Sequence, residues 1–162
     1  VRCVRTEYQG EVYMDSAVEF FFEPSPELGY VNFEVNCGGA CLIGIPPPRG
    51  SAPIPPDAPP GFGRGALGVE HGRKVSVRAS LPRVVEPEIA GPVTWLVQCR
   101  FPFEAVEAAL GPLGPVAGRA WRGNFYKIAG DNTHPHFGQW SPIGERLNFH
   151  QPRYFAPIVF EG

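Results

Sequence analysis

Residues 13–36 read Tyr-Met-Asp-Ser-Ala-Val-Glu-Phe-Phe-Phe-Glu-Pro-Ser-Pro-Glu-Leu-Gly-Tyr-Val-Asn-Phe-Glu-Val-Asn, and this stretch decides the fold. Two runs rich in Val and Phe, 17–23 and 30–36, lie on either side of a short segment that contains two prolines and a glycine. Aromatic and β-branched residues favour strands, whereas Pro and Gly favour turns. The stretch therefore predicts a β-hairpin.

Side-chain alternation divides this hairpin into two faces. In the second run, Val31 and its apolar neighbours at every other position alternate with Asn32, Glu34 and other polar residues. In the first run, Val18 and two phenylalanines share one face, which leaves Glu19 on the other. Because strands repeat every two residues, we expect Glu19 and Glu34 to lie together on one polar face of a sheet.

Glu19 is a carboxylate on a mostly apolar strand, and an unpaired buried charge is costly. One interpretation is that an arginine pairs with Glu19 or that Glu19 lies at a sheet edge. The other is a binding face that uses carboxylates and amides as hydrogen-bond acceptors. The spacing of the residues leaves both open.

The composition favours an all-β fold. The 162 residues include 20 Pro and 20 Gly but only one Met, and 19% are charged. This composition is typical of short strands joined by loops, so we expect a single domain, 1–162, that forms an antiparallel β-sandwich. Eight prolines between positions 46 and 60, followed by three glycines, predict a long surface loop inserted over 46–65.

The net charge of −2 gives no electrostatic reason to expect a nucleic-acid partner. The sequence contains no apolar run of about 20 residues, so we expect no membrane span. No signal peptide opens the sequence. The four cysteines, Cys3, Cys37, Cys41 and Cys99, permit two disulfides, one or none, and we expect mostly free thiols.

Alternation and turn signals place the remaining elements. We expect strands over 1–4, 75–81, 93–100, 121–128 and 156–160, and one short helix over 104–110 that Gly111 ends. Polar loops with three histidines lie between the last two strands. Loops on a rigid sheet often carry binding sites, so we expect a functional site there.

Five motifs, D-S-A-V-E-F-F (15–21), Y-V-N-F-E-V-N (30–36), W-R-G-N-F-Y-K-I (121–128), W-S-P (140–142) and F-H-Q-P-R-Y-F (149–155), resemble those of carbohydrate-binding module family 9. They cover most of the chain in the family's order. The resemblance implies a β-sandwich, similar to DOMON domains, in which two aromatic rings clamp a sugar. It also implies non-catalytic binding of a mono- or oligosaccharide, association with a glycoside hydrolase, and an extracellular or periplasmic location.

The resemblance also implies which residues bind the sugar. The first clamping aromatic falls on Tyr13, and the second on Phe149 or its neighbour His150. The polar positions of the strands fall on Glu19, Glu34 and Lys127. Trp140 matches a family tryptophan.

Three alternatives to simple sugar binding remain open, the first implied by the similarity to DOMON domains and the other two drawn from the residues. A DOMON-type haem domain would use Met14 with His134 or His150 as axial ligands. A glycosidase would use Glu19 and Glu34 as its carboxylate pair. A metal site would combine His134 and His136 with His150 or Asp131. We expect no cofactor, apart from a structural calcium that the sequence does not place.

Overall fold

The computed structural model describes residues 1–47, 50–52, 55, 58–59 and 61–161. The strands are β1 (Ser16–Ser25), β2 (Gly29–Asn36), β3 (Cys41–Ile45), β4 (Gly65–Ala66), β5 (Ser76–Ala79), β6 (Val97–Arg100), β7 (Ala120–Ala129), β8 (His136–Gln139) and β9 (Ala156–Val159). The helices are α1 (Val69–Gly72) and α2 (Phe103–Leu110), with 3₁₀ turns η1 (Val12–Met14) and η2 (Pro152–Tyr154).

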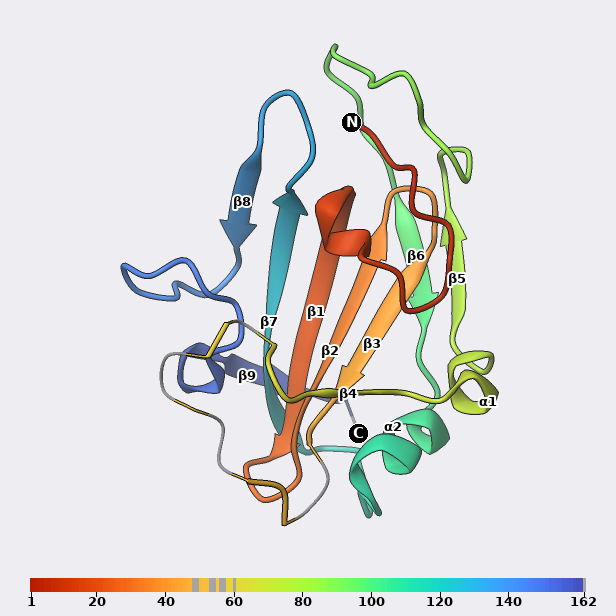
Figure 1. Ribbon diagram of the computed structural model, residues 1–162. Coiled ribbons are helices and arrows are strands. Elements are labelled where there is room, and N and C mark those ends of the chain that lie inside the picture. Colours follow the sequence, from red (N-terminus) through yellow and green to blue (C-terminus); the bar gives the residue numbers. More distant parts are fainter. Residues whose placement is uncertain (48–49, 53–54, 56–57, 60, 162) are drawn as a thin grey trace.

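Seven strands form one antiparallel sheet in the order β4-β3-β2-β1-β7-β8, and β9 also pairs with β7. β1 and β7, which are about a hundred residues apart in sequence, therefore lie side by side at its centre (Figure 1). β5 and β6 form a separate two-stranded sheet. Both sheets are antiparallel, which confirms the predicted all-β sandwich class.

The predicted faces of the hairpin are confirmed by its packing. The face that carries Phe22, Val31 and Phe33 contributes to the main hydrophobic core, together with residues of α2 and with Trp121 of β7. Residues of β5 and β6 pack against this core, so the small sheet and α2 cover one face of the large sheet. The opposite face carries the candidate functional site.

The predicted strands 17–23, 30–36, 75–81, 121–128 and 156–160 and the helix 104–110 are each confirmed, with shifted ends. The strand expected at 1–4 is wrong, because only Cys3 makes an isolated bridge there, to Val85. The strand expected over 93–100 begins only at Val97. The predicted loop 46–65 lies partly outside the described residues, and its last residue belongs to β4.

The N-terminal segment is attached to the sheet through Asp15, which is 1% exposed. Its carboxylate accepts hydrogen bonds from the backbone N–H groups of Val4 and Arg5 and from Asn36 Nδ2. Arg5 Nη1 lies 3.0 Å from Asp15 Oδ1. These bonds fix the chain just before β1 and therefore fix the position of η1.

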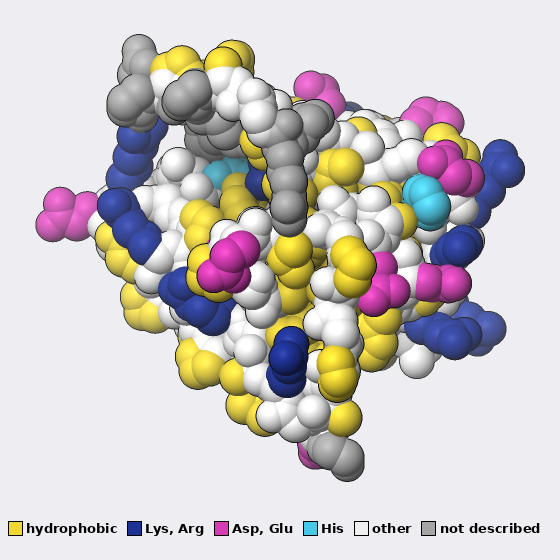
Figure 2. Space-filling view, turned by 90° about the horizontal axis from the view of Figure 1, so that it is seen from below, with side chains coloured by type: hydrophobic (Ala, Val, Ile, Leu, Met, Phe, Trp, Pro, Cys, Tyr) yellow, Lys and Arg dark blue, Asp and Glu magenta, His cyan; other side chains and the backbone are white. Residues whose placement is uncertain are grey.

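The surface carries charges of both signs. Seen from below, acidic and basic side chains are scattered around a discontinuous band of hydrophobic side chains (Figure 2). None of the described helices has both the length and the hydrophobicity needed to span a bilayer. All four cysteines are free thiols.

Candidate functional site

A pocket of about 570 Å³ opens on the polar face of the large sheet. Strands β1 to β3 supply its floor, and the segments 61–66 and 147–150, together with parts of β7, β8 and the N-terminal segment, supply its walls. Its lining residues are Gln9, Tyr13, Glu19, Asn32, Glu34, Leu42, Gly44, Gly61, Arg64, Gly65, Ala66, Ile128, Phe137, Leu147, Asn148, Phe149 and His150.

Two carboxylic acids and an amide form the polar floor. Glu19 and Glu34 are directly opposite each other on β1 and β2, as the alternation predicts. They are 4% and 5% exposed, and Asn32 is 3% exposed. Asn32 Nδ2 donates to Glu34 Oε1 over 2.9 Å. The floor therefore offers several oxygen acceptors within an apolar surrounding.

The electrostatics of this floor follow from burial. Burial and the neighbouring Glu34 raise the pKa of Glu19 well above its ordinary value. Burial raises the pKa of Glu34 to about 7, against the opposing effects of Asn32 and Arg64. Burial is the main cause of both pKa shifts, because a low-dielectric surrounding disfavours the ionised form, and the like charge of Glu34 adds to the shift of Glu19. The pair therefore keeps a proton into the neutral range.

Arg64 connects the wall of the pocket to its floor. Its Nε donates to Asn32 Oδ1 over 2.6 Å, and its Nη2 donates to the carbonyl oxygens of Tyr30 and Gly44. The guanidinium carbon also lies 3.8 Å from the centroid of the Tyr30 ring. These contacts hold the 61–66 segment, which crosses in front of the sheet in Figure 1, against β2 and β3.

His150 closes the pocket beside Arg64. Its Nδ1 is hydrogen-bonded to Tyr30 Oη over 2.9 Å, and its ring contacts Phe21. Burial, with the nearby positive charge of Arg64, lowers the pKa of His150 to about 4. At neutral pH His150 is therefore an uncharged hydrogen-bonding group.

Tyr13 reaches the pocket from η1. This turn is held in place by Val12, which is fully buried, and by the carbonyl of Met14, which accepts a hydrogen bond from the Asp131 N–H over 2.7 Å. The Tyr13 hydroxyl donates to Glu11 Oε1. Tyr13 thus lines the pocket as a half-buried ring.

Phe149 lines the pocket but is largely a core residue. It is 8% exposed, and its ring stacks on Tyr126 of β7 with centroids 4.1 Å apart and an interplanar angle of 11°. One face of the Phe149 ring is therefore covered. Two other apolar residues, Phe137 and Leu147, are 46% and 54% exposed and also line the pocket.

The structure places Lys127 away from this pocket. In the register of β1 and β7, Lys127 is opposite Val18, whereas Glu19 is opposite Tyr126. Because side chains alternate, Lys127 lies on the other face of the sheet from Glu19. Its Nζ lies 5.9 Å from the Trp95 ring centroid, and burial lowers its pKa to about 8. Lys127 therefore cannot share a ligand with Glu19, contrary to expectation.

Trp140 also lies outside the pocket. It is 55% exposed and packs edge-on against Phe125, with centroids 5.8 Å apart. Phe125 stacks on Phe20, which belongs to the core face of β1. Of the seven predicted site residues, five line one pocket and two lie on the opposite side of the sheet.

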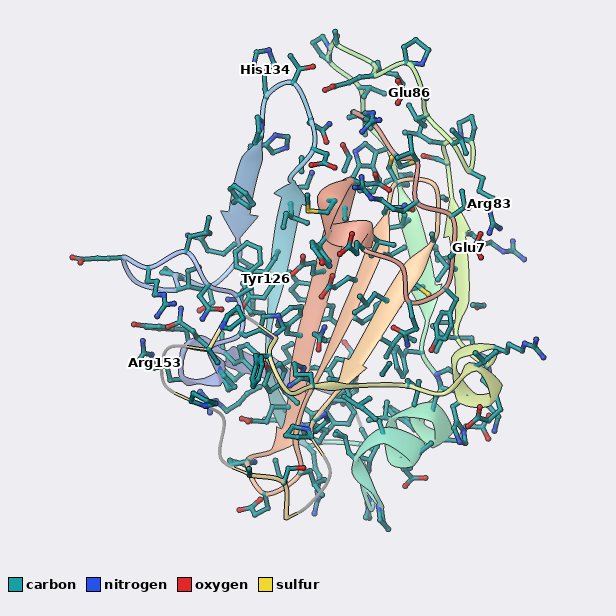
Figure 3. All side chains as sticks on the ribbon, in the orientation of Figure 1. Glu7, Arg83, Glu86, Tyr126, His134 and Arg153 are labelled. Carbon is teal, nitrogen blue, oxygen red and sulfur yellow. The ribbon has the colours of Figure 1, made fainter. Side chains whose placement is uncertain are left out.

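The alternative chemistries find little support in these positions. Among the described residues, no three His, Cys, Asp or Glu side chains are placed to hold a metal ion. His134 lies exposed at the tip of the turn between β7 and β8 (Figure 3), whereas His150 is in the pocket and bonded to Tyr30. Met14 is not a pocket-lining residue, so the two ligands expected for haem do not meet there.

The interpretation that an arginine pairs with Glu19, or that Glu19 lies at a sheet edge, is wrong for the part of the chain that is described. Glu19 lies on a central strand and not at an edge, and it forms no ion pair with a described arginine. The sequence analysis also missed Arg64, Asn32 and Gln9. The signal for Arg64 was its place as the single cation in Gly61-Phe62-Gly63-Arg64-Gly65, directly after the Pro-rich segment.

Comparison with known proteins gives two matches. The model of the family described as carbohydrate-binding family 9 matches residues 1–160. The crystal structure of a "putative carbohydrate-binding protein" from Bacteroides uniformis ATCC 8492 superposes with a TM-score of 0.80 at 34% sequence identity, covering 99% of this chain and 68% of that chain. None of the curated proteins compared with the chain matches it. With its family model matched over nearly its whole length, this chain belongs to carbohydrate-binding family 9.

Proposed function

We propose that this protein is a non-catalytic binding domain whose pocket over β1, β2 and β3 holds one unit of a mono- or oligosaccharide. The observation that carries the proposal is a pocket of about 570 Å³ with a polar floor and an aromatic rim, in a chain of carbohydrate-binding family 9. A volume of this size suits a small ligand.

The chemistry of the lining suits a sugar. A saccharide has apolar C–H faces that pack on aromatic rings, and a ring of hydroxyl groups that need donors and acceptors. The floor offers carboxyl and amide oxygens from Glu19, Glu34 and Asn32, and Gln9 and Asn148 are further amides of the lining. The rim offers the rings of Tyr13 and Phe137.

We assign the stacking role to Tyr13 and Phe137, in place of the expected pair of Tyr13 with Phe149 or His150. Phe149 already has one ring face against Tyr126, and it is 8% exposed. Phe137 is 46% exposed and lines the same pocket. A ring with a free face is better suited to pack on a sugar.

Calorimetric titration with a panel of mono- and oligosaccharides tests this proposal. We expect Tyr13→Ala and Phe137→Ala each to weaken binding by about 1–3 kcal/mol, the scale of losing one stacked, desolvated ring. Trp140→Ala is the matched control, because it removes an exposed aromatic ring on the opposite side of the sheet. If Trp140→Ala lowers the affinity for sugar and Tyr13→Ala leaves it unchanged, the site lies on the side of the sheet that carries Trp140.

The family membership supports a binding role, and we propose that the domain works as an accessory to a glycoside hydrolase outside the cytoplasm. The opposed carboxyls of Glu19 and Glu34 also permit a direct test for catalysis. We expect no release of reducing sugar when the protein is incubated with polysaccharides that it binds. Sugar release that Glu19→Gln abolishes would contradict the non-catalytic role.

A further inference from the structure

The carboxyl pair on the pocket floor has no cationic partner within the described chain. Glu19 and Glu34 are directly opposite in register and are each more than nine-tenths buried. Buried carboxylates are normally paired or fully hydrogen-bonded. Elsewhere in this fold the rule holds, since the buried Asp15 is paired with Arg5.

The hydrogen bonds of the pair are also incomplete. Glu34 Oε1 accepts a bond from Asn32, but Glu34 Oε2 is buried and has no partner among the described residues. Glu19 receives no hydrogen bond from any described donor either. A buried acceptor left without a donor is destabilising, and more so when it is charged. An orphaned carboxyl that lines an open pocket indicates a place for a donor on the ligand.

The nearest cation is occupied elsewhere. Arg64 directs Nε and Nη2 to Asn32 Oδ1 and to two backbone carbonyls, and it forms no ion pair with Glu19 or Glu34. His150 is uncharged at neutral pH, and Lys127 lies on the other face of the sheet. With both carboxyls ionised, the described lining has two negative charges and one positive charge.

We propose, on the basis of the proposed sugar-binding function, that the pocket prefers saccharides that carry a protonated amine, with the ammonium group between Glu19 and Glu34. An ammonium has three donors and a positive charge, so it can satisfy the orphaned oxygens and neutralise the pair together. A hydroxyl group offers one donor and no charge. An N-acetylated sugar keeps one N–H and loses the charge.

Binding of a sugar with an ammonium group and binding of a neutral sugar differ in proton release. In the empty pocket, burial and mutual repulsion make the pair retain a proton. An ammonium beside the pair favours the doubly ionised form, so its binding expels that proton into solution. A neutral sugar has no such effect, and it leaves the proton in place.

Isothermal titration calorimetry tests the proposal with methyl glycosides of glucosamine and galactosamine, each beside its N-acetylated and its 2-hydroxy counterpart. Two buffers of different ionisation enthalpy, at about pH 6.5, report the protons released. We expect each amine to bind at least about tenfold more tightly than its counterparts and to release protons. Glu34→Gln should reduce the preference to about twofold or less, whereas Glu27→Gln, at an exposed acid of the β1–β2 turn, should leave it unchanged.

The outcomes separate this proposal from the function on which it rests. If the neutral sugars bind as tightly as the amines, or if amine binding releases no proton, the amine preference is overturned and sugar binding stands. If none of the sugars binds, both proposals are overturned. The comparison of ligands on the unaltered protein decides the matter even if Glu34→Gln fails to fold.

Discussion

Arg64 determines how the pocket is built. Its guanidinium bonds to Asn32, which in turn donates to Glu34, so one chain of hydrogen bonds runs from the wall to the floor. An arginine suits this position because its fixed fork of donors can serve a side chain and two carbonyls at once. The same bonds direct Nε and Nη2 of Arg64 to Asn32 and to backbone carbonyls, and Arg64 forms no ion pair with Glu19 or Glu34.

The buried carboxyl pair should make stability depend on pH. The folded protein keeps the Glu34 proton up to about pH 7, because burial raises its pKa to about 7 from an ordinary value of 4.5. Between these values the folded state holds more protons than the unfolded chain. The contribution of Glu34 to stability is therefore complete at low pH and is lost as the pH rises from about 4.5 to about 7.

Comparison of the unaltered protein with Glu34→Gln measures this effect. We expect the variant to gain stability relative to the unaltered protein across that window, with a slope of up to about 1.4 kcal/mol per pH unit. Urea unfolding at a series of pH values gives the difference. The difference between the two proteins is needed because His150 also titrates. Its pKa is lowered from 6.5 to about 4, so its contribution to the free energy of unfolding is lost as the pH falls, which is opposite to the effect of Glu34. A difference that is constant with pH would contradict the prediction.

At the scale of the element, β3 can line the pocket because its residue 44 is a glycine, which has no side chain. Gly44 lies opposite Asn32 in the sheet, and a Cβ atom there would come within 2.6 Å of Asn32 Nδ2. Asn32 cannot move aside cheaply, because Arg64 and Glu34 hold both ends of its amide. The glycine therefore makes room for the hydrogen-bonded floor.

Gly44→Ala should consequently disrupt the floor. We expect a loss of about 1–3 kcal/mol in the free energy of unfolding, typical of overpacking, together with weaker sugar binding. Gly138→Ala is the control, because a Cβ atom there would meet only Lys127 Cβ at an ordinary 3.6 Å. The control should be neutral or more stable by about 0.5–1 kcal/mol, since alanine restricts the unfolded chain. Equal behaviour of the two variants, measured by urea unfolding and calorimetry, would contradict this account.

The elements also explain how far the sequence could predict the site. Alternation within β1 and β2 is local, so the shared face of Glu19 and Glu34 was predictable from the hairpin alone. The face of Lys127 was not, because it depends on the register between β1 and β7, which no local pattern specifies. Arg64 was missed for a similar reason, since it enters from a glycine-rich segment without periodicity. The sugar contacts of Tyr13, Glu19, Glu34, Phe149 and His150 remain predictions.

At the scale of the whole molecule, contacts between distant parts of the sequence hold the fold together. β1 is paired with β7, and β9 also pairs with β7. The main core combines residues from Phe22 to Trp121. The N-terminal amine donates to the Ile89 carbonyl, so even the first residue is attached to a distant loop. The segments that build this core therefore come from widely separated parts of the described chain.

This arrangement leads us to expect that residues 1–162 unfold as one domain. Urea unfolding followed by far-UV circular dichroism reports the strands, whereas tryptophan fluorescence reports the surroundings of Trp95, Trp121 and Trp140, of which Trp121 is buried in the main core. Because the large sheet and the core contain the same distant segments, both signals should give the same midpoint and the same slope. A chain of this length whose distant segments share one main core is expected to show one cooperative transition. Two midpoints would show that the β5–β6 sheet and the helices unfold apart from the pocket sheet, and the pocket would then persist after the layer behind it is lost.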